Sequence, residues 1–546
     1  MTTGPRNGRT GSARPVALHA DAAPGTAARE RPDGRMGGGR GTAASRRPID
    51  SPVMWALSAV GHRRLGAAGA LAAAVGGWIS GKLPAHDPWG LWIDHGLTVR
   101  TAAAVLAYIG LTVLVVAWWQ YGRTASSVRE TLVTLAWWTA PFLLVPPLYS
   151  ADVYSYIAQG AMVVEGLDVY SVGPSSLDPA GIGGDAAASV GNHWRDTPAP
   201  YGPLFLLLSA AVAKVTGGTI VPAVLAMRLI ALASLVLIVW ALRRLAREHG
   251  RSESRALWLG ALNPLLLMHV VAGMHNDGLM IGLMLAGLAL ALRGRWVAGS
   301  ALVGLAMMVK SPAAVSLLFI GVTVHASATG PQLRRWAKGL IAPGLVACAV
   351  AGSATLVSGT GFGWLRTQGV AGNIHTALSV VSDLGLGLGE LGRLLLGTDP
   401  EPVKSAVQTL GLAAAVVLIL LLARKAMNGH LPPVHALGLA LLALVALSPM
   451  VQPWYLLWGL VVVAATQQQG RVTTVLVVLS AALVYETHPT GSTPPFGFAL
   501  AAVAAVVATL VVRRNPLRAE AAELPGPRAT GPAPAPRPAE APQGTA

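Results

Sequence analysis

A carboxylate and two tyrosines follow directly on a long apolar run, in the stretch LLVPPLYSADVYSYIAQG that begins at Leu143. Asp152 is followed at short spacing by Tyr154, Tyr156 and Gln159. A carboxylate placed there can act as a general base, and the neighbouring polar side chains can bind its substrate. A structural interpretation competes with this one, because aspartate is a preferred N-cap and tyrosines are common at membrane interfaces. We predict that Asp152 is the catalytic base and that these neighbours bind substrate.

Other polar side chains interrupt the apolar sequence at separate places. The predicted substrate-binding residues beyond the first group are Tyr170, His193, Arg195, Tyr201, His275, Asn276, Asp277, Lys310, Gln452, Trp454 and Tyr455. The triplet from His275 to Asp277 is also ordinary turn chemistry. It is a weak signal for a metal, so we assign no metal ligands and keep a divalent metal as an alternative.

Lys310 and the segment QPWYLLW, which begins at Gln452, carry the most specific hypotheses of this group. A lysine that breaks an apolar run is costly in a membrane, and phosphate is its natural partner. The structural alternative is that Lys310 extends to the membrane surface. The aromatic residues can stack on a sugar or line a lipid chain, or they can form a simple interfacial belt.

The elements that must position these residues are membrane helices. The chain has 546 residues, of which 53% are hydrophobic and only 12% charged. Repeated apolar segments predict an all-α polytopic membrane protein with about fourteen crossings. The run over 131–149 and the run over 256–273 are each read as one span, and the run over 203–216 as a re-entrant segment. Residues 61–513 form the predicted membrane domain, between disordered tails over 1–60 and 514–546.

The basic residues indicate an orientation. Arginine clusters such as RRLAREHGRSESR at 243–255 fall on one side if spans alternate, which predicts a plasma-membrane protein with both termini in the cytoplasm. The long loops over 81–99, 150–202, 358–404 and 486–496 then lie outside, together with the candidate residues and the NIH motif at 373–375. The net charge of +16 is thus explained without nucleic acid. Cys348 is the only cysteine, which excludes disulfides within the chain.

An outward site restricts the chemistry. The sequence contains no P-loop or dinucleotide fingerprint, and nucleotide sugars are cytoplasmic, so a donor must come from the membrane itself. A polyprenyl-phosphate sugar meets this requirement. Its phosphate is a good leaving group, so transfer needs one base for the acceptor hydroxyl and cationic or hydrogen-bonding groups for the phosphate.

The motifs ADVYSYIAQG, GLDVYSVGP, PAPYGPLF, MHNDGLM, MMVKSPAAV and MVQPWYLLW, in this order, resemble those of a known family. They are similar to the actinobacterial polyprenol-phosphomannose-dependent α-1,6-mannosyltransferases, which belong to the C superfamily of membrane glycosyltransferases. The resemblance covers roughly residues 60 to 510. It implies a fold like that superfamily's, mannose transfer with inversion to a lipomannan-type glycolipid or glycan, and an outer-loop acid that maps onto Asp152.

Two alternatives stay open after this resemblance. The superfamily's usual paired acids are absent, since Val153 and Tyr154 follow Asp152, and related enzymes transfer other sugars such as arabinofuranose. A transporter or lipid flippase would also have many helices, but such folds often show internal repeats, and we find none.

Overall fold

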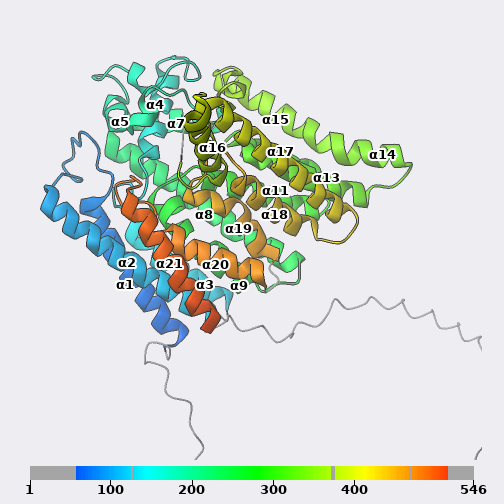
Figure 1. Ribbon diagram of the computed structural model, residues 1–546, viewed down its shortest axis with the longest axis horizontal. Helices are drawn as coiled ribbons and strands as arrows, with labels where there is room; N and C mark the ends of the chain where they lie inside the picture. The colour runs from blue at the N-terminus through cyan, green and yellow to red at the C-terminus, as the bar shows by residue number, and fades with distance from the viewer. Residues whose placement is uncertain (1–56, 125–126, 370–375, 467–469, 515–546) are drawn as a thin grey trace, which may run out of the picture. The chain divides into compact units, whose positions relative to one another are not determined.

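The computed structural model describes residues 57–124, 127–369, 376–466 and 470–514. These residues form helices joined by turns and loops, and no strand occurs among them (Figure 1). Most of both predicted tails and the NIH motif at 373–375 lie outside the described residues.

The helices differ greatly in length. In the first half of the chain they are α1 (Ala59–Ser80), α2 (Leu97–Thr124), α3 (Val128–Thr139), η2 (Ala140–Phe142), α4 (Asp152–Val164), η3 (Pro174–Ser176), α5 (Gly184–Ser189), α6 (Asn192–Arg195), α7 (Pro203–Thr216), α8 (Ile220–Glu248), α9 (Glu253–Gly260), α10 (Pro264–Leu266), η4 (Leu267–Ala272) and α11 (Asp277–Leu292). In the second half they are α12 (Trp296–Met307), η5 (Ser311–Ala314), α13 (Val315–Ser327), α14 (Gln332–Trp336), η6 (Ala337–Ile341), α15 (Ala342–Ser358), η7 (Gly363–Leu365), α16 (Val380–Leu396), α17 (Pro400–Met427), α18 (Pro433–Ala446), η9 (Pro453–Tyr455), α19 (Leu456–Thr466), α20 (Arg471–Leu483) and α21 (Pro495–Arg514).

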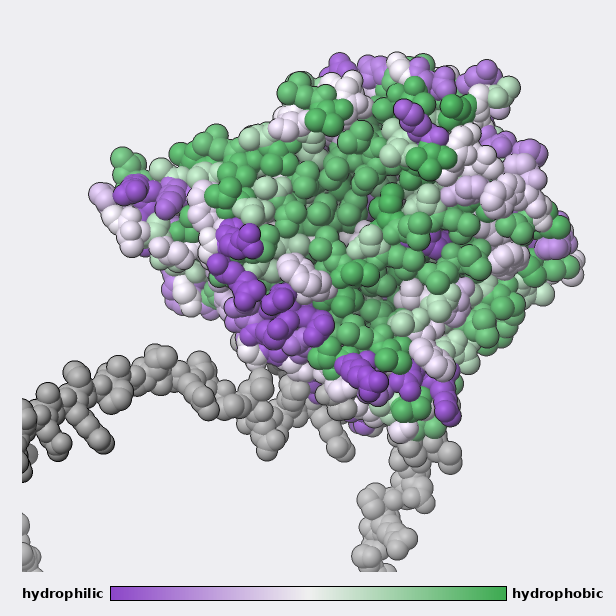
Figure 2. All heavy atoms as spheres, turned by 180° about the vertical axis from the view of Figure 1, so that it is seen from behind, coloured by the Kyte–Doolittle hydropathy of each residue, from purple (hydrophilic) through white to green (hydrophobic). Residues whose placement is uncertain are grey.

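The apolar character and length of these helices make this a membrane protein. Among the described residues, 5 helical segments are long and apolar enough to cross a membrane, or 6 if α9, α10 and η4 count as one bent span. Several other apolar helices have only 10–17 residues. In Figure 2 hydrophobic side chains cover much of the visible face, and hydrophilic ones gather mainly toward its edges. The all-helical membrane class is therefore confirmed, whereas the number of crossings stays a prediction.

Two predicted continuous spans are broken, and the first break lies directly before Asp152. The run over 131–149 ends as a helix at Phe142, and the chain to Ala151 is not helical. Pro146 and Pro147 have no N–H to donate, so the helix cannot continue through them. The predicted span over 256–273 bends by 50° between α9 and α10. There Pro264 starts the new helix and the Asn263 side chain caps it by accepting from Leu265 N.

Close packing holds the broken segments in place. A Cβ on Gly160 of α4 would lie 2.3 Å from the backbone of Ser209, so only glycine allows α4 to pack this closely on α7. The buried Arg228 of α8 donates to the carbonyls of Phe142 and Val145, the latter at 2.8 Å. Arg228 therefore anchors the backbone that leads to Asp152.

Candidate active site

Segments that are distant in the sequence bring charged side chains together at the candidate active site. Asp152 begins α4, His275 and Asp277 lie between η4 and α11, and Lys310 precedes η5. The aromatic residues around η9 pack against them. The site is therefore built from residues at helix ends, and the break before α4 places Asp152 among them.

Backbone hydrogen bonds fix the segment that precedes Asp152. Leu148 N donates to Ala272 O at 3.2 Å, and Tyr149 N donates to Pro489 O at 2.9 Å. Tyr149 has φ 60° and Met274 has φ 57°, and these are the described non-glycine residues with positive φ. Such conformations cost free energy and concentrate at functional sites. Both strained residues come just before a candidate side chain of the site.

The Asp152 carboxylate is not a helix cap. The N-cap position of α4 is Ala151, which makes no side-chain cap bond, and the turn is closed by Asp152 N donating to Ser150 Oγ at 3.0 Å. Asp152 Oδ2 instead lies 3.3 Å from His275 Nδ1 and 3.5 Å from the donating hydroxyl of Tyr156. Oδ1 has no hydrogen bond or ion pair with the described residues. The Asp152 side chain is 21% exposed, so an acceptor hydroxyl can reach it.

Asp277, unlike the partly exposed Asp152, is buried and paired with a cation. Its carboxylate is 1% exposed and receives Lys310 Nζ on both oxygens at 3.0 Å. Trp458 Nε1 donates to Asp277 Oδ1 at 2.6 Å. This buried pair keeps both charges compensated, as a low-dielectric interior requires. Lys310 therefore does not extend to the membrane surface but points inward to Asp277.

Aromatic rings form one wall of the site. The His275 ring stacks on Trp454 with centroids 3.6 Å apart, and Tyr455 stacks on Trp458 at 4.2 Å. The Lys310 ammonium lies 4.5 Å from the Tyr455 ring centroid, within cation–π range. These contacts show that the QPWYLLW motif packs on charged residues and is not simply an interfacial belt.

Some of the buried polar groups without hydrogen-bond partners belong to the segments that form the site. Among the described residues, neither side-chain end group of Gln159 or Asn276 has a partner, nor do the ring nitrogens of His269 and His275. The Asp152 carboxylate is near His275 Nδ1, but the angle is not that of a hydrogen bond. Buried polar groups are normally satisfied, so a cluster of unsatisfied ones indicates a place where a polar ligand binds.

The remaining predicted residues fall into two groups. Tyr201 packs edge-on against Tyr156 at 5.2 Å, and its carbonyl accepts from the Tyr170 hydroxyl at 3.0 Å, so both tyrosines support the wall near Asp152. Tyr154 instead donates to Lys82 O, and the Gln452 carbonyl accepts from Tyr455 N, which are structural contacts.

His193 and Arg195 lie apart from this cluster. Both are exposed on the short helix α6, and no described contact joins either side chain to Asp152, His275 or Lys310. The structure therefore does not bring these two residues into the charged cluster.

The sequence reasoning missed two members of the site. Trp458 was quoted within its motif but was not among the predicted site residues, and His269 was not singled out. His269 is fully buried, and its ring centroid lies 5.0 Å from that of Trp454. An ionisable residue inside an apolar segment is a functional candidate by default, and this signal could have identified His269.

Within the described ranges, no group of three or more His, Cys, Asp or Glu side chains is arranged to hold a metal ion. Asp152, His275 and Asp277 thus provide no three-ligand set of the kind that catalytic metals use in proteins. The chemistry developed below uses the protein's own side chains.

Comparison with known proteins shows the family of the chain. Residues 63–326 match the model of the alpha-(1→6)-mannopyranosyltransferase N-terminal domain, and residues 381–514 match the MptB C-terminal domain. A probable alpha-(1→6)-mannopyranosyltransferase of Mycolicibacterium smegmatis is 36% identical, covering 89% of this chain and 94% of the relative. This chain belongs to the alpha-(1→6)-mannopyranosyltransferase family.

Two further members of the family support the assignment. An alpha-(1→6)-mannopyranosyltransferase of Mycobacterium tuberculosis is 36% identical over 78% of this chain and 82% of its own. One from Corynebacterium glutamicum is 31% identical over 83% of this chain and 82% of its own. No solved structure matches the chain. The family resemblance and the glycosyltransferase class predicted from the motifs are thus confirmed, and the transporter alternative is disfavoured.

Proposed function

We propose that this protein transfers mannose from a polyprenyl-phosphate mannose to the 6-hydroxyl of a growing α-1,6-mannan, with Asp152 as general base. The main support is the contrast between the two carboxylates of the site. Asp277 is buried and bound to Lys310, whereas Asp152 is accessible and has one oxygen without a protein partner. Only a carboxylate of the second kind can receive a proton from a substrate.

The proposed step is a single displacement. The acceptor oxygen attacks C1 of the β-linked mannose, the bond from C1 to the phosphate oxygen breaks, and polyprenyl phosphate leaves. The acceptor hydroxyl proton passes to Asp152 Oδ1. Attack opposite the leaving group inverts C1 and gives an α-linkage.

The neighbours of Asp152 have supporting roles in this proposal. The Tyr156 hydroxyl donates to Oδ2, and His275 lies 3.3 Å from the same oxygen, which leaves Oδ1 for the acceptor. Lys310 gives two N–H donors to Asp277 and can offer its third to a hydroxyl of the donor's mannose. The stacked rings beside Lys310 are suited to the face of a sugar.

We place this site outside the cytoplasmic membrane, on a fold of the C superfamily with about fourteen crossings. A lipid-linked donor and an acceptor glycan both meet the enzyme there. Arabinofuranose transfer from a related donor remains the second candidate, since nothing in the charged cluster itself selects between the two sugars.

The deciding experiment uses the full chain in lipid nanodiscs. Polyprenyl-phosphate [¹⁴C]mannose and an α-1,6-mannobioside acceptor should give a labelled trisaccharide that is cleaved by an α-1,6-mannosidase. Polyprenyl-phosphate arabinofuranose should give no product. Transfer from the arabinose donor in place of the mannose donor would reject the proposal, as would a β-linked product.

A further inference from the structure

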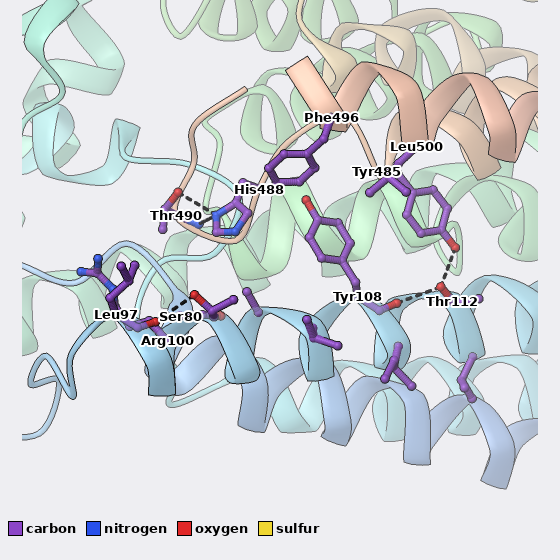
Figure 3. A pocket seen from close by; sticks show the side chains of 15 residues that line it. Ser80, Leu97, Arg100, Tyr108, Thr112, Tyr485, His488, Thr490, Phe496 and Leu500 are labelled. Atoms are coloured by element: carbon purple, nitrogen blue, oxygen red, sulfur yellow. Dashed lines mark hydrogen bonds between the residues drawn. The ribbon is translucent and has the colours of Figure 1, made fainter. Parts of the chain in front are cut away.

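A groove lies between α2, α21 and the connection from Tyr485 to Phe496 (Figure 3). Its volume is about 680 Å³, and most of its lining side chains are apolar or aromatic. This volume is within the usual range of ligand sites. Neither Asp152 nor the charged cluster lines it, so the groove is a separate feature.

The groove faces the bilayer. Val105 and Ile109 of α2 are 54% and 55% exposed, and Phe496 at the start of α21 is 50% exposed. Both α2 and α21 are among the segments able to cross a membrane. An apolar groove between two such helices is open to lipid chains from the side.

One end of the groove is polar. Arg100, His488 and Thr490 lie toward this end in Figure 3, and Tyr485 and Thr112 toward the other. Burial, and then the nearby Arg100 charge, lower the pKa of His488 below its ordinary value, so His488 is neutral at pH 7. Arg100 is therefore the residue of the lining that is positively charged at pH 7. Among the described residues its ion-pair partner is Asp94, at 3.1 Å on the exposed surface.

The polar end is also joined to the candidate active site. His488 begins a turn in which Gly491 N donates to His488 O at 2.8 Å. The next residue, Pro489, accepts from Tyr149 N, and a Cβ on Gly491 would lie 2.8 Å from the backbone of Ser150. This turn thus packs directly on the residues that precede Asp152.

We propose that this groove binds the isoprenoid chain of the lipid-linked sugar donor, with the donor phosphate toward the Arg100 end. The assignment rests on the proposed function, because it names where the donor's lipid lies. A long apolar chain fits the lateral opening, and one anionic phosphate complements one guanidinium. The adjoining turn then leads the sugar toward Asp152.

Binding can be measured without any transfer reaction. A diazirine-bearing polyprenyl monophosphate, incubated with the full chain in nanodiscs of phosphatidylglycerol and irradiated, should label peptides from the first half of α2 and from 485–500. Unlabelled polyprenyl monophosphate should compete, whereas uncharged polyprenol should compete at least tenfold less well. Arg100→Gln should remove this difference. Labelling spread evenly over α15 and α17 would show ordinary boundary lipid and reject the proposal.

Chain length gives the kinetic test. Val105→Trp places a bulky side chain in the groove, and Leu106→Trp places the same side chain on an exposed part of α2 that does not line it. Val105→Trp should raise KM for a long-chain donor about tenfold. This is the effect expected if the indole keeps about one to two methylenes of the donor chain from being buried in the groove. Val105→Trp should leave KM for a five-carbon donor unchanged, because Val105 lies about 7.5 Å along α2 from Arg100. Leu106→Trp should alter neither value.

The outcomes separate the two proposals. Specific labelling of the groove without mannose transfer would overturn the proposed function but keep the lipid site. Mannose transfer with equal effects of Val105→Trp on long and short donors would keep the function and reject the groove. Displacement of the probe by the glycolipid acceptor alone would assign the groove to the acceptor's anchor and also reject our proposal.

Discussion

At the scale of single residues, the site separates two carboxylates by their surroundings. Asp277 is neutralised by Lys310 in a buried pair, while Asp152 keeps one free oxygen and partial exposure. The same side chain thus has a structural role at one position and is suited to proton transfer at the other. Substitutions at these two positions should therefore have different consequences.

We expect Asp152→Asn to reduce turnover on the order of 100-fold or more, because the amide cannot accept the hydroxyl proton. Thermal unfolding should change little, since Asp152 caps no helix and only a 3.3 Å contact with His275 is altered. The assay is mannose transfer by purified protein at saturating donor. Asp178→Asn, on an exposed loop between α4 and α7, is the matched control and should keep its turnover. Near-normal turnover of Asp152→Asn would reject Asp152 as base.

A second prediction concerns the buried pair. Lys310→Met alone should lower the free energy of unfolding by about 3–5 kcal/mol, because it leaves the Asp277 charge buried and unpaired. Adding Asp277→Asn removes that charge, so the double variant should regain most of the lost stability. Its mannose transfer should stay low if Lys310 also contacts the donor's mannose. Recovery of both stability and transfer by the double variant would give the pair a purely structural role.

At the scale of elements, the non-helical chain from Leu143 to Ala151 decides where Asp152 lies. Its prolines end the preceding helix, and its backbone bonds reach η4, the turn at Pro489 and Arg228 of α8. These bonds fix the position of the first residue of α4, Asp152, relative to His275. Loss of any of these anchors should affect catalysis at a distance.

We expect Arg228→Leu to destabilise the protein by about 1–3 kcal/mol for each carbonyl that it leaves unpaired. Turnover should fall together with stability, because the segment before Asp152 loses its anchor. Arg228→Lys can still donate to one carbonyl, so it should recover part of the turnover and part of the stability. The measurements are the unfolding midpoint in detergent and kcat. Leu229→Ala, at the next and exposed position of α8, is the control. Unchanged kcat in a destabilised Arg228→Leu would separate Arg228 from the positioning of Asp152.

At the scale of the whole molecule, the orientation in the membrane decides which substrates reach the site. The α8 helix has 29 residues and is thus about 43 Å long, enough to connect both surfaces of a bilayer. Arg228 near its first turns bonds to the segment before Asp152, while the arginine cluster begins in its last turns and continues beyond them. The candidate site and that cluster should therefore lie on opposite sides.

Cysteine labelling tests this arrangement in a Cys348→Ala background. Gly191 and Gly387 have open space where a side chain would be added, and Arg251 is exposed beyond α8. Gly191→Cys and Gly387→Cys should react with an impermeant maleimide in intact cells, and Arg251→Cys only after lysis. Labelling of Arg251→Cys in intact cells would place the site in the cytoplasm and remove the argument for a lipid-linked donor.

The sequence by itself determined the helical membrane class, the family and most of the residue types at the site. Apolar runs and the motifs around Asp152, Asp277, Lys310 and Trp454 are local features that remain visible without a fold. Hydropathy alone, however, did not show where the helices break. It read the runs over 131–149 and 256–273 as single spans, because a window average is insensitive to Pro146, Pro147 and Pro264.

Only the tertiary structure decided which of these residues act on one another. In the structure Lys310 pairs with Asp277 and does not extend to the membrane surface. Trp458 and His269 contact residues of the site. His193 and Arg195 lie outside the charged cluster. These contacts include the ring contact between His269 and Trp454, which are 185 positions apart. Local propensity contains no information on such contacts, because they form only when the bent helices pack and bury the charges together.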